Sequence, residues 1–358
     1  MQFGIQFFPD VGPDEKPADQ YFADAIAIAE EADHLGFHHV RTVEHYFTPY
    51  GGYSPNPLIF LTAIAARTRR ARLITGALLP VFNHPLKMAG EIGMLDAISG
   101  GRLDVGFARA FLPHEFQRFG VSPDESVTRF REGLEQIDLL LRQENVAHEG
   151  KFHSFPPTTS LPRPTQKPRP KFYVASIASP DSFAFAGRSG FSVMAIPLTG
   201  AKMQTLIKAY RDAWREAGHP GQGEVLIAYH MVCHENGDTA REIARSKLQA
   251  YIDSLVAAAS GWVTGVTSKD YPGYDKVIEG MKSTTMDSLI AANAAWIGSP
   301  AEIRDAIARA QAETGGFEQA SLQVNFNTMP REQAIASIRL FASEVMPHFA
   351  QPAGLAAE

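Results

Sequence analysis

The segment FHHVRTVEHYFTPYGGYSPNPLIFLTAIAARTRRARLITGALL, residues 37–79, contains one complete strand–helix–strand repeat. Residues 37–43 and 72–79 are short apolar runs, which are typical of strands buried on both faces. Between them a turn rich in glycine and proline leads into apolar side chains at helical spacing over residues 57–68. A helix between two such strands predicts that the strands are parallel neighbours.

The same cycle repeats along the 358 residues. The expected strands cover residues 3–8, 37–43, 72–79, 102–107, 171–175, 191–196, 224–233 and 320–326. The helical patterns that follow them cover residues 19–35, 57–68, 85–98, 124–143, 179–188, 201–217, 238–258 and 330–345. A doubly wound sheet rarely has so many units, whereas a (β/α)8 barrel has this number at about this length. The sequence therefore predicts an α/β fold, a (β/α)8 TIM barrel, as a single domain over residues 1–358.

Two stretches depart from the cycle. Residues 145–170 carry six prolines, which favour an extended surface connection. Residues 259–297 form an insertion after the seventh helix, with several glycines and with Trp262 and Trp296. Because closure of the barrel does not require this insertion, we expect it to be a lid, with a subunit interface as the alternative.

Composition limits the class of protein. The chain is 45% hydrophobic and 20% charged, which is ordinary for a globular protein. A formal net charge of −6 without a basic run argues against a nucleic-acid partner. The only cysteine, Cys233, excludes an internal disulfide. Residues 2–8 resemble a strand more than a signal peptide, and no long apolar segment is present, so we expect a cytoplasmic protein.

The C-terminal ends of the predicted strands should carry the active site. The residues there that could act on a ligand are Phe7, Phe8, Glu44, His45, Tyr46, Phe47, Ala108, Arg109, Phe111, Ser176, Ile177 and His230. This predicts an aromatic mouth with one carboxylate–imidazole pair and one arginine. Nucleotide-binding glycine motifs, a zinc-protease HExxH motif and a GxSxG elbow are absent from the sequence.

Local sequence leaves two interpretations open for each polar motif. Glu44 and His45 are either an acid–base pair or a solvated loop pair. The run from Val174 to Asp181 offers backbone N–H groups at a helix start, which suits a phosphate, but Ser179 could simply cap that helix. Arg109 could bind the same phosphate or belong to a structural ion pair.

Residues 41–120 resemble the bacterial luciferase-like, flavin-dependent monooxygenases. The resemblance rests on Glu44-His45-Tyr46-Phe47, on the later string LP…HP…LD…SGGR…G, and on Val-Ala-Ser-Ile-Ala-Ser at residues 174–179. It is strongest over residues 1–200, weakens over 245–295 and resumes at WIGSPAEIRDAIARA, residues 296–310.

The resemblance implies reduced FMN bound at the barrel mouth and a reaction with O2 through a flavin C4a-hydroperoxide. It also implies a separate flavin reductase, a small or carrier-tethered organic substrate and a homodimer. In the matching positions His45 is the catalytic imidazole and Glu44 orients it.

For the cofactor, the resemblance makes Arg109 a phosphate clamp beside Ala175, Ser176 and Ile177. It also places a non-prolyl cis peptide near Thr75-Gly76, against the flavin ring. Ala108 stands where light-emitting members have a reactive cysteine, which makes efficient bioluminescence doubtful. Phe7, Phe8, Tyr46, Phe47, Phe111 and His230 would then line the substrate pocket.

Two other functions fit the same barrel. One is hydride transfer with the deazaflavin F420, although relatives of that kind more often have aspartate where this chain has Glu44. The other is a non-catalytic flavin-binding barrel, against which the intact Glu44, His45 and Arg109 argue.

Overall fold

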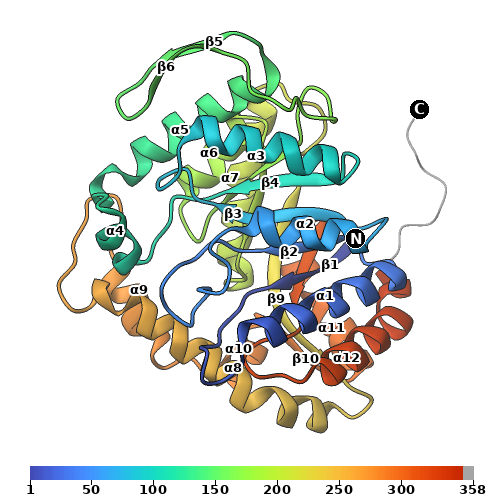
Figure 1. The fold of residues 1–358 in the computed structure, drawn as a ribbon. Helices are drawn as coiled ribbons and strands as arrows, with labels where there is room; N and C mark the ends of the chain where they lie inside the picture. Colours follow the sequence, from blue (N-terminus) through green and yellow to red (C-terminus); the bar gives the residue numbers. More distant parts are fainter. Residues whose placement is uncertain (350–358) are drawn as a thin grey trace.

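The computed structural model describes residues 1–349 and contains a closed barrel of parallel strands (Figure 1). The barrel strands are β1 (Gln2–Phe7), β2 (His39–Thr42), β3 (Arg72–Leu78), β4 (Leu103–Phe107), β7 (Lys171–Ala175), β8 (Ser192–Ala195), β9 (Val225–Cys233) and β11 (Gln319–Gln323). Each pairs with the next, and β11 pairs with β1 to close the ring. The predicted (β/α)8 barrel is confirmed.

Helices follow the strands and cover the outside of the barrel. They are α1 (Ala18–Leu35), α2 (Pro57–Arg67), α3 (Pro85–Ile98), α5 (Ser126–Arg142), α6 (Pro180–Arg188), α7 (Gly200–Glu216), α8 (Gly237–Ala259) and α12 (Arg331–Glu344). Local sequence sets their ends. The side chain of Asn56 accepts from the N–H groups of Leu58 and Ile59 at the start of α2, and Gly36 ends α1 with φ 85°. Among the described residues, no helix is long and apolar enough to cross a membrane.

Two connections contain more regular structure than the sequence predicts. Within residues 145–170, β5 (Val146–Glu149) and β6 (Ser154–Thr158) form an antiparallel hairpin beyond α5. After β4, the short helices α4 (Pro113–Phe119) and η1 (Pro123–Glu125) precede α5. The prolines of β6 are tolerated because the two-stranded hairpin has free edges.

The expected insertion is partly built into the sheet. It contains η2 (Ser260–Trp262), α9 (Tyr274–Met281), α10 (Met286–Ala291) and a ninth strand, β10 (Ala295–Gly298), before α11 (Pro300–Thr314). β9 extends past the end of β8, and β10 pairs in parallel with the edge that this leaves free, Ala295 opposite His230. Trp296 is buried and stacks on Tyr229 with ring centroids 3.9 Å apart. The last residues of the insertion are therefore continuous with the sheet, which the sequence does not predict.

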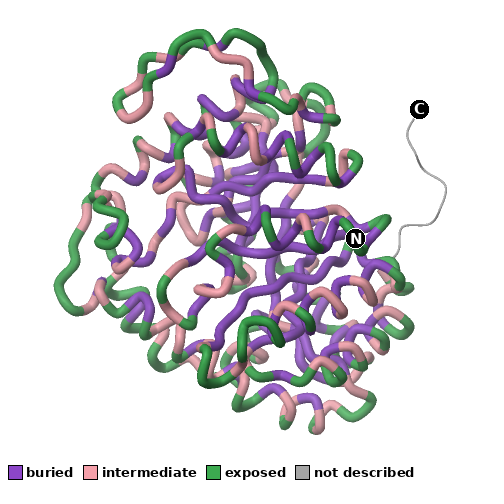
Figure 2. Tube along the Cα trace, viewed as in Figure 1, coloured by how far each residue is buried: buried purple, intermediate pink, exposed green. Residues whose placement is uncertain are grey.

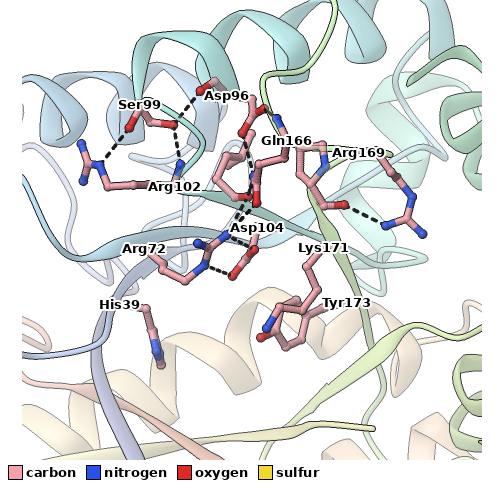
Figure 3. A network of polar contacts seen from close by, with 12 residues as sticks. His39, Arg72, Asp96, Ser99, Arg102, Asp104, Gln166, Arg169, Lys171 and Tyr173 are labelled. Atoms are coloured by element: carbon pink, nitrogen blue, oxygen red, sulfur yellow. Dashed lines mark hydrogen bonds and ion pairs between the residues drawn. The ribbon is translucent and has the colours of Figure 1, made fainter. Parts of the chain in front are cut away.

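The N-terminal end of the barrel is closed by a polar network (Figure 3). Arg72 forms a two-point ion pair with the fully buried Asp104, with Nε 2.6 Å from Oδ2. The side chain of Gln166 donates to Asp96 at 2.7 Å and accepts from Arg72 at 3.1 Å. Above this network, Ile74, Tyr173, Met194 and Leu226 fill the barrel interior. Figure 2 shows the strands buried along most of their length, so the opposite, C-terminal end remains for a site.

Candidate active site

His45 lies in the turn that follows β2, at the C-terminal mouth of the barrel. Only 8% of its surface is exposed, and its ring contacts Phe8, Tyr50 and Phe111 at centroid distances of 5.5, 5.6 and 5.8 Å. Gly51 permits this packing because a Cβ there would lie 2.5 Å from the His45 Cβ. The imidazole is thus held in a predominantly aromatic environment.

The carboxylate that orients His45 is Glu115. Its Oε1 lies 3.1 Å from His45 Nδ1 and accepts from the backbone N–H of Tyr46 at 2.9 Å. Glu115 belongs to the first turn of α4 and is fully buried, and its Oε2 has no hydrogen-bond partner among residues 1–349. The expectation that Glu44 orients His45 is corrected accordingly. The sequence around Glu115 gives no local signal for this role, because the contact joins residues 70 positions apart.

Glu44 instead ties the ends of β2 and β3 together. Its carboxylate accepts from the hydroxyl of Tyr46, from Asn83 Nδ2 at 2.8 Å and from the N–H of Leu79 at 3.0 Å. Burial raises the pKa of Glu44 to about 7, because the ionised form loses its hydration. Glu44 can therefore hold or release a proton near neutral pH.

One half of the mouth has small inward residues. Gly76, Ala108 and Ala175 occupy the inward positions near the ends of the neighbouring strands β3, β4 and β7. The peptide bond between Gly76 and Ala77 is cis, one bond beyond the predicted location. Thr75 exchanges hydrogen bonds with the backbone of Gly106 and so joins β3 to β4. Ala108 and Ala175 present only methyl groups at the strand ends, and the side chain of Arg41 packs against Gly76.

The other half of the mouth is polar. Arg41 Nη1 donates to Gln6 Oε1, Gln6 Nε2 donates to Gln323 Oε1 at 3.3 Å, and Gln323 Nε2 donates to the carbonyl of Phe8 at 3.3 Å. His230 lies beside this chain on β9, and burial lowers its pKa to about 4. Its neutral ring packs on Tyr251 of α8 at 4.6 Å.

The predicted phosphate residues lie on two loops. Arg109 is half-buried, donates from Nη1 to the carbonyl of Asp270 at 3.2 Å and lies 5.0 Å above the ring of Tyr271. Ser176 is buried at the end of β7, and its N–H donates to Met194. Ser179 caps α6 by accepting from the N–H of Ser182 at 3.3 Å, which confirms the capping interpretation. Phosphate binding by Arg109, Ser176 and Ile177 remains a prediction.

The expected pocket residues divide into two groups. Phe8 and Phe111 touch His45, and His230 faces the barrel interior. Phe7 points to the opposite side of β1 and packs on Phe60 of α2 at 5.7 Å, because successive strand residues face opposite ways. Tyr46 and Phe47 pack with Phe119 outside the mouth, and Phe47 is 53% exposed. Phe7, Tyr46 and Phe47 are therefore not lining residues of this pocket.

Sequence reasoning missed Arg41, Tyr50, Glu115 and Tyr251. A signal existed for Arg41, since strand alternation places it on the same side of β2 as His39. Tyr251 comes from α8, and its hydroxyl lies 3.4 Å from that of Tyr50. No group of three His, Cys, Asp or Glu side chains in the described part of the chain could hold a metal ion.

Comparison with known proteins matches residues 1–318 to the family described as luciferase-like monooxygenase. The oxygenase component of the flavin-dependent trigonelline monooxygenase of Acinetobacter baylyi is 27% identical over 363 residues, covering 98% of this chain and 96% of that protein. The crystal structure of monooxygenase RslO1 from Streptomyces bottropensis is 45% identical, with a TM-score of 0.87 and coverage of 98% of this chain and 100% of that one.

Two more distant structures share the fold. The oxygenating constituent of 3,6-diketocamphane monooxygenase of Pseudomonas putida, in complex with FMN, is 22% identical with a TM-score of 0.81, covering 98% of this chain and 99% of that one. An F420-dependent secondary alcohol dehydrogenase is 16% identical with a TM-score of 0.75 and the same coverage. At these identities the likeness concerns the fold alone, so the fold does not choose between FMN and the deazaflavin.

Proposed function

Because this chain belongs to the luciferase-like monooxygenase family and is a flavin-dependent monooxygenase, we propose that it is the oxygenase component of a two-component system. It takes reduced FMN from a separate flavin reductase and transfers one oxygen atom of O2 to a small or carrier-tethered organic substrate. The observation that carries this proposal is the buried His45, fixed by Glu115 and enclosed by aromatic rings at the barrel mouth.

The residues of the mouth fit a flavin. The flat ring system would lie against Ala108 and Ala175, beside Gly76 and the Arg41 side chain that packs on it. The phosphate would lie at the loops that carry Arg109 and Ser176, near the N-terminus of α6. Bound reduced FMN supplies the electrons that activate O2.

The protein's own residues then control water and protons. The carboxylate of Glu115 accepts from His45 Nδ1–H, so the neutral imidazole carries its lone pair on Nε2. Nε2 is the atom that takes or gives a proton at the reacting group, while Phe8, Tyr50 and Phe111 exclude water from it. Exclusion of water matters because an oxygenase that admits it releases peroxide instead of oxygenated product.

We also propose that the insertion acts as a lid over this site. Tyr271 donates from its hydroxyl to the carbonyl of Ala110 at 2.8 Å, and Trp262 donates from Nε1 to the carbonyl of Phe111 at 2.8 Å. Together with the contact of Arg109 to Asp270, these bonds join the insertion to the loop that follows β4. A movement of the insertion would therefore displace the loop that carries Arg109 and Phe111.

Exposed apolar side chains support the proposed homodimer. Ile59 of α2 is 71% exposed, and Met94 and Ile98 of the neighbouring α3 are 57% and 48% exposed. Such side chains on adjacent helices are typical of a surface that a second subunit covers. The reductase would deliver reduced FMN to the opposite, C-terminal end of the barrel.

The test is an anaerobic titration of the purified protein with reduced FMN and, separately, with reduced F420, followed by mixing with O2. We expect binding of reduced FMN and, with a substrate, oxygenated product. Binding of reduced F420 alone, without oxygen incorporation, would make the deazaflavin enzyme the correct function. Failure to convert any substrate despite flavin binding would support the non-catalytic barrel.

A further inference from the structure

Arg41 is a buried cation without a counter-ion. Only 9% of its surface is exposed, and no carboxylate of residues 1–349 lies within ion-pair distance. Its Nη2 donates to the carbonyl of Gly76 at 2.9 Å, its Nη1 donates to Gln6, and its Nε has no partner. Both acceptors are neutral. Burial lowers the pKa of Arg41 to about 10, which still leaves it charged at neutral pH.

The surrounding residues hold this charge in place. The Gln323–Gln6 amide pair, anchored on the carbonyl of Phe8, directs the Gln6 oxygen toward Arg41. Gly76 leaves space for the guanidinium, because a Cβ at that position would lie 1.9 Å from Arg41 Nε. Burying a charge without a partner costs free energy. The fixed, unpaired guanidinium of Arg41 therefore indicates that an anionic group of a ligand pairs with it.

The position of Arg41 indicates which ligand would supply the anionic group. The guanidinium lies against Gly76, the first residue of the cis peptide, next to the small-residue half of the mouth that would receive a flat ring system. Arg41 is thus at the edge of the proposed ring site, beside Gly76.

We propose that Arg41 is the counter-ion of anionic reduced flavin and makes the protein select the reduced cofactor over the oxidised one. This inference rests on the proposed function. Reduced flavin loses its N1 proton near neutral pH, and the charge spreads over N1 and the neighbouring carbonyl oxygen. That planar edge matches the remaining N–H groups of a guanidinium, as a carboxylate does. The ring of oxidised flavin is neutral and gains little from Arg41.

The experiment compares the wild type with Arg41→Met and Arg41→Lys in anaerobic titrations with reduced FMN, oxidised FMN and reduced riboflavin. A charge-assisted contact predicts that Arg41→Met loses about ten- to a hundredfold in affinity for reduced FMN. Affinity for oxidised FMN should change little, and Arg41→Lys should lie between. The midpoint potential of the bound flavin should fall by about 30 mV for each tenfold change in the affinity ratio.

A second variant keeps the inference testable if Arg41→Met fails to fold. Gln6→Glu preserves the shape of the site but gives Arg41 an internal counter-ion, so it should also reduce the preference for reduced FMN. The loss in both variants should be equally large with reduced riboflavin, because the phosphate is not involved.

Two outcomes separate this inference from the proposed function. If the wild type binds reduced FMN and oxygenates a substrate, but Arg41→Met keeps the same ratio of reduced to oxidised affinity, the role of Arg41 is overturned and the function stands. An equal loss for both redox forms would also overturn it, since it would mark Arg41 as a packing residue. If the wild type does not bind reduced FMN at all, the proposed function itself fails.

Discussion

His45 presents its two ring nitrogens to different surroundings. Nδ1 faces Glu115 at 3.1 Å, whereas Nε2 makes no hydrogen bond within residues 1–349. We expect Glu115→Gln to lower turnover about ten- to a hundredfold, because the imidazolium loses a charged partner. The KM for reduced FMN should stay near the wild-type value.

His45→Ala is the comparison variant. It should fold normally, lose most of its turnover and release more peroxide, since the proton donor and acceptor is gone. A folded Glu115→Gln enzyme with wild-type turnover would show that Glu115 does not act through His45. Retention of coupled product formation by His45→Ala would remove His45 from the mechanism.

Glu44 should make stability depend on pH. Burial raises its pKa from 4.5 to about 7, so folding favours the protonated form. Its contribution to stability is fully present below about pH 4.5 and is lost as the pH rises through about 7, by roughly 3 kcal/mol. Glu44→Gln lacks this loss. Urea unfolding at pH 5 and pH 8 should show the wild type losing stability relative to Glu44→Gln, and a constant difference would contradict the assignment.

Arg109→Ala should weaken binding of reduced FMN by about ten- to a hundredfold, because a charge-assisted contact to the phosphate is lost. Reduced riboflavin lacks the phosphate and serves as the control, so its affinity should change much less. The variant also loses the bond to the carbonyl of Asp270. Equal losses for both flavins would show that Arg109 acts through the insertion and not through the phosphate.

At the scale of elements, the insertion should be mobile without ligands and protected with them. Tyr271→Phe removes the hydroxyl that donates to Ala110 at 2.8 Å, worth about 1 kcal/mol. We expect faster proteolysis at Gly265 and Gly273 and more peroxide release during turnover. Reduced FMN with substrate should slow the cutting of the wild type.

Tyr274→Phe is the matched control, because the hydroxyl of Tyr274 makes no hydrogen bond in the described structure. If ligands leave the cutting pattern unchanged and Tyr271→Phe still couples O2 to product, the insertion is not a lid. An interface role would then account for it better.

The eight repeats were predictable because each strand and helix carries its own local pattern. β10 was not, since Ala295–Gly298 is short and its partner is the free part of β9. Glu115 was missed for a related reason, because its contact with His45 joins residues 70 positions apart through α4. Phe7 and Phe8 were both assigned to the pocket, although alternation along β1 allows only one of them to face inward.

For the whole molecule, the two ends of the barrel differ in how many of their buried polar atoms form hydrogen bonds. At the N-terminal end Arg72 bonds to Asp104 and Gln166, although His39 Nε2 is buried without a partner among the described residues (Figure 3). At the C-terminal end Arg41 Nε, Glu115 Oε2, His230 Nε2, Asp10 Oδ2 and Asn325 Oδ1 are buried without partners among the described residues. The hydrogen bonds at the N-terminal end stabilise the barrel, whereas the unpaired polar atoms at the C-terminal end are available to bind a ligand.

The proposed homodimer is tested at the same scale. A charge introduced at a covered apolar surface is costly, so if the protein is a dimer through α2 and α3, Ile59→Glu combined with Met94→Glu should convert it into a monomer in sedimentation velocity. Val277→Glu is the matched control, because Val277 is also an exposed apolar residue, 44% exposed, but lies on α9 of the insertion. Dissociation by Val277→Glu instead would place the interface on the insertion.

The attachment of the insertion at both ends has a consequence for protein engineering. Its first residues continue from α8, and its last residues are fixed by the pairing of β10 with β9. The segment between Trp262 and β10 is therefore attached to the barrel at both ends and can be exchanged without changing either attachment. Grafting the corresponding segment of a related oxygenase between α8 and β10 should alter which substrates are accepted, while His45 and Glu115 keep their geometry.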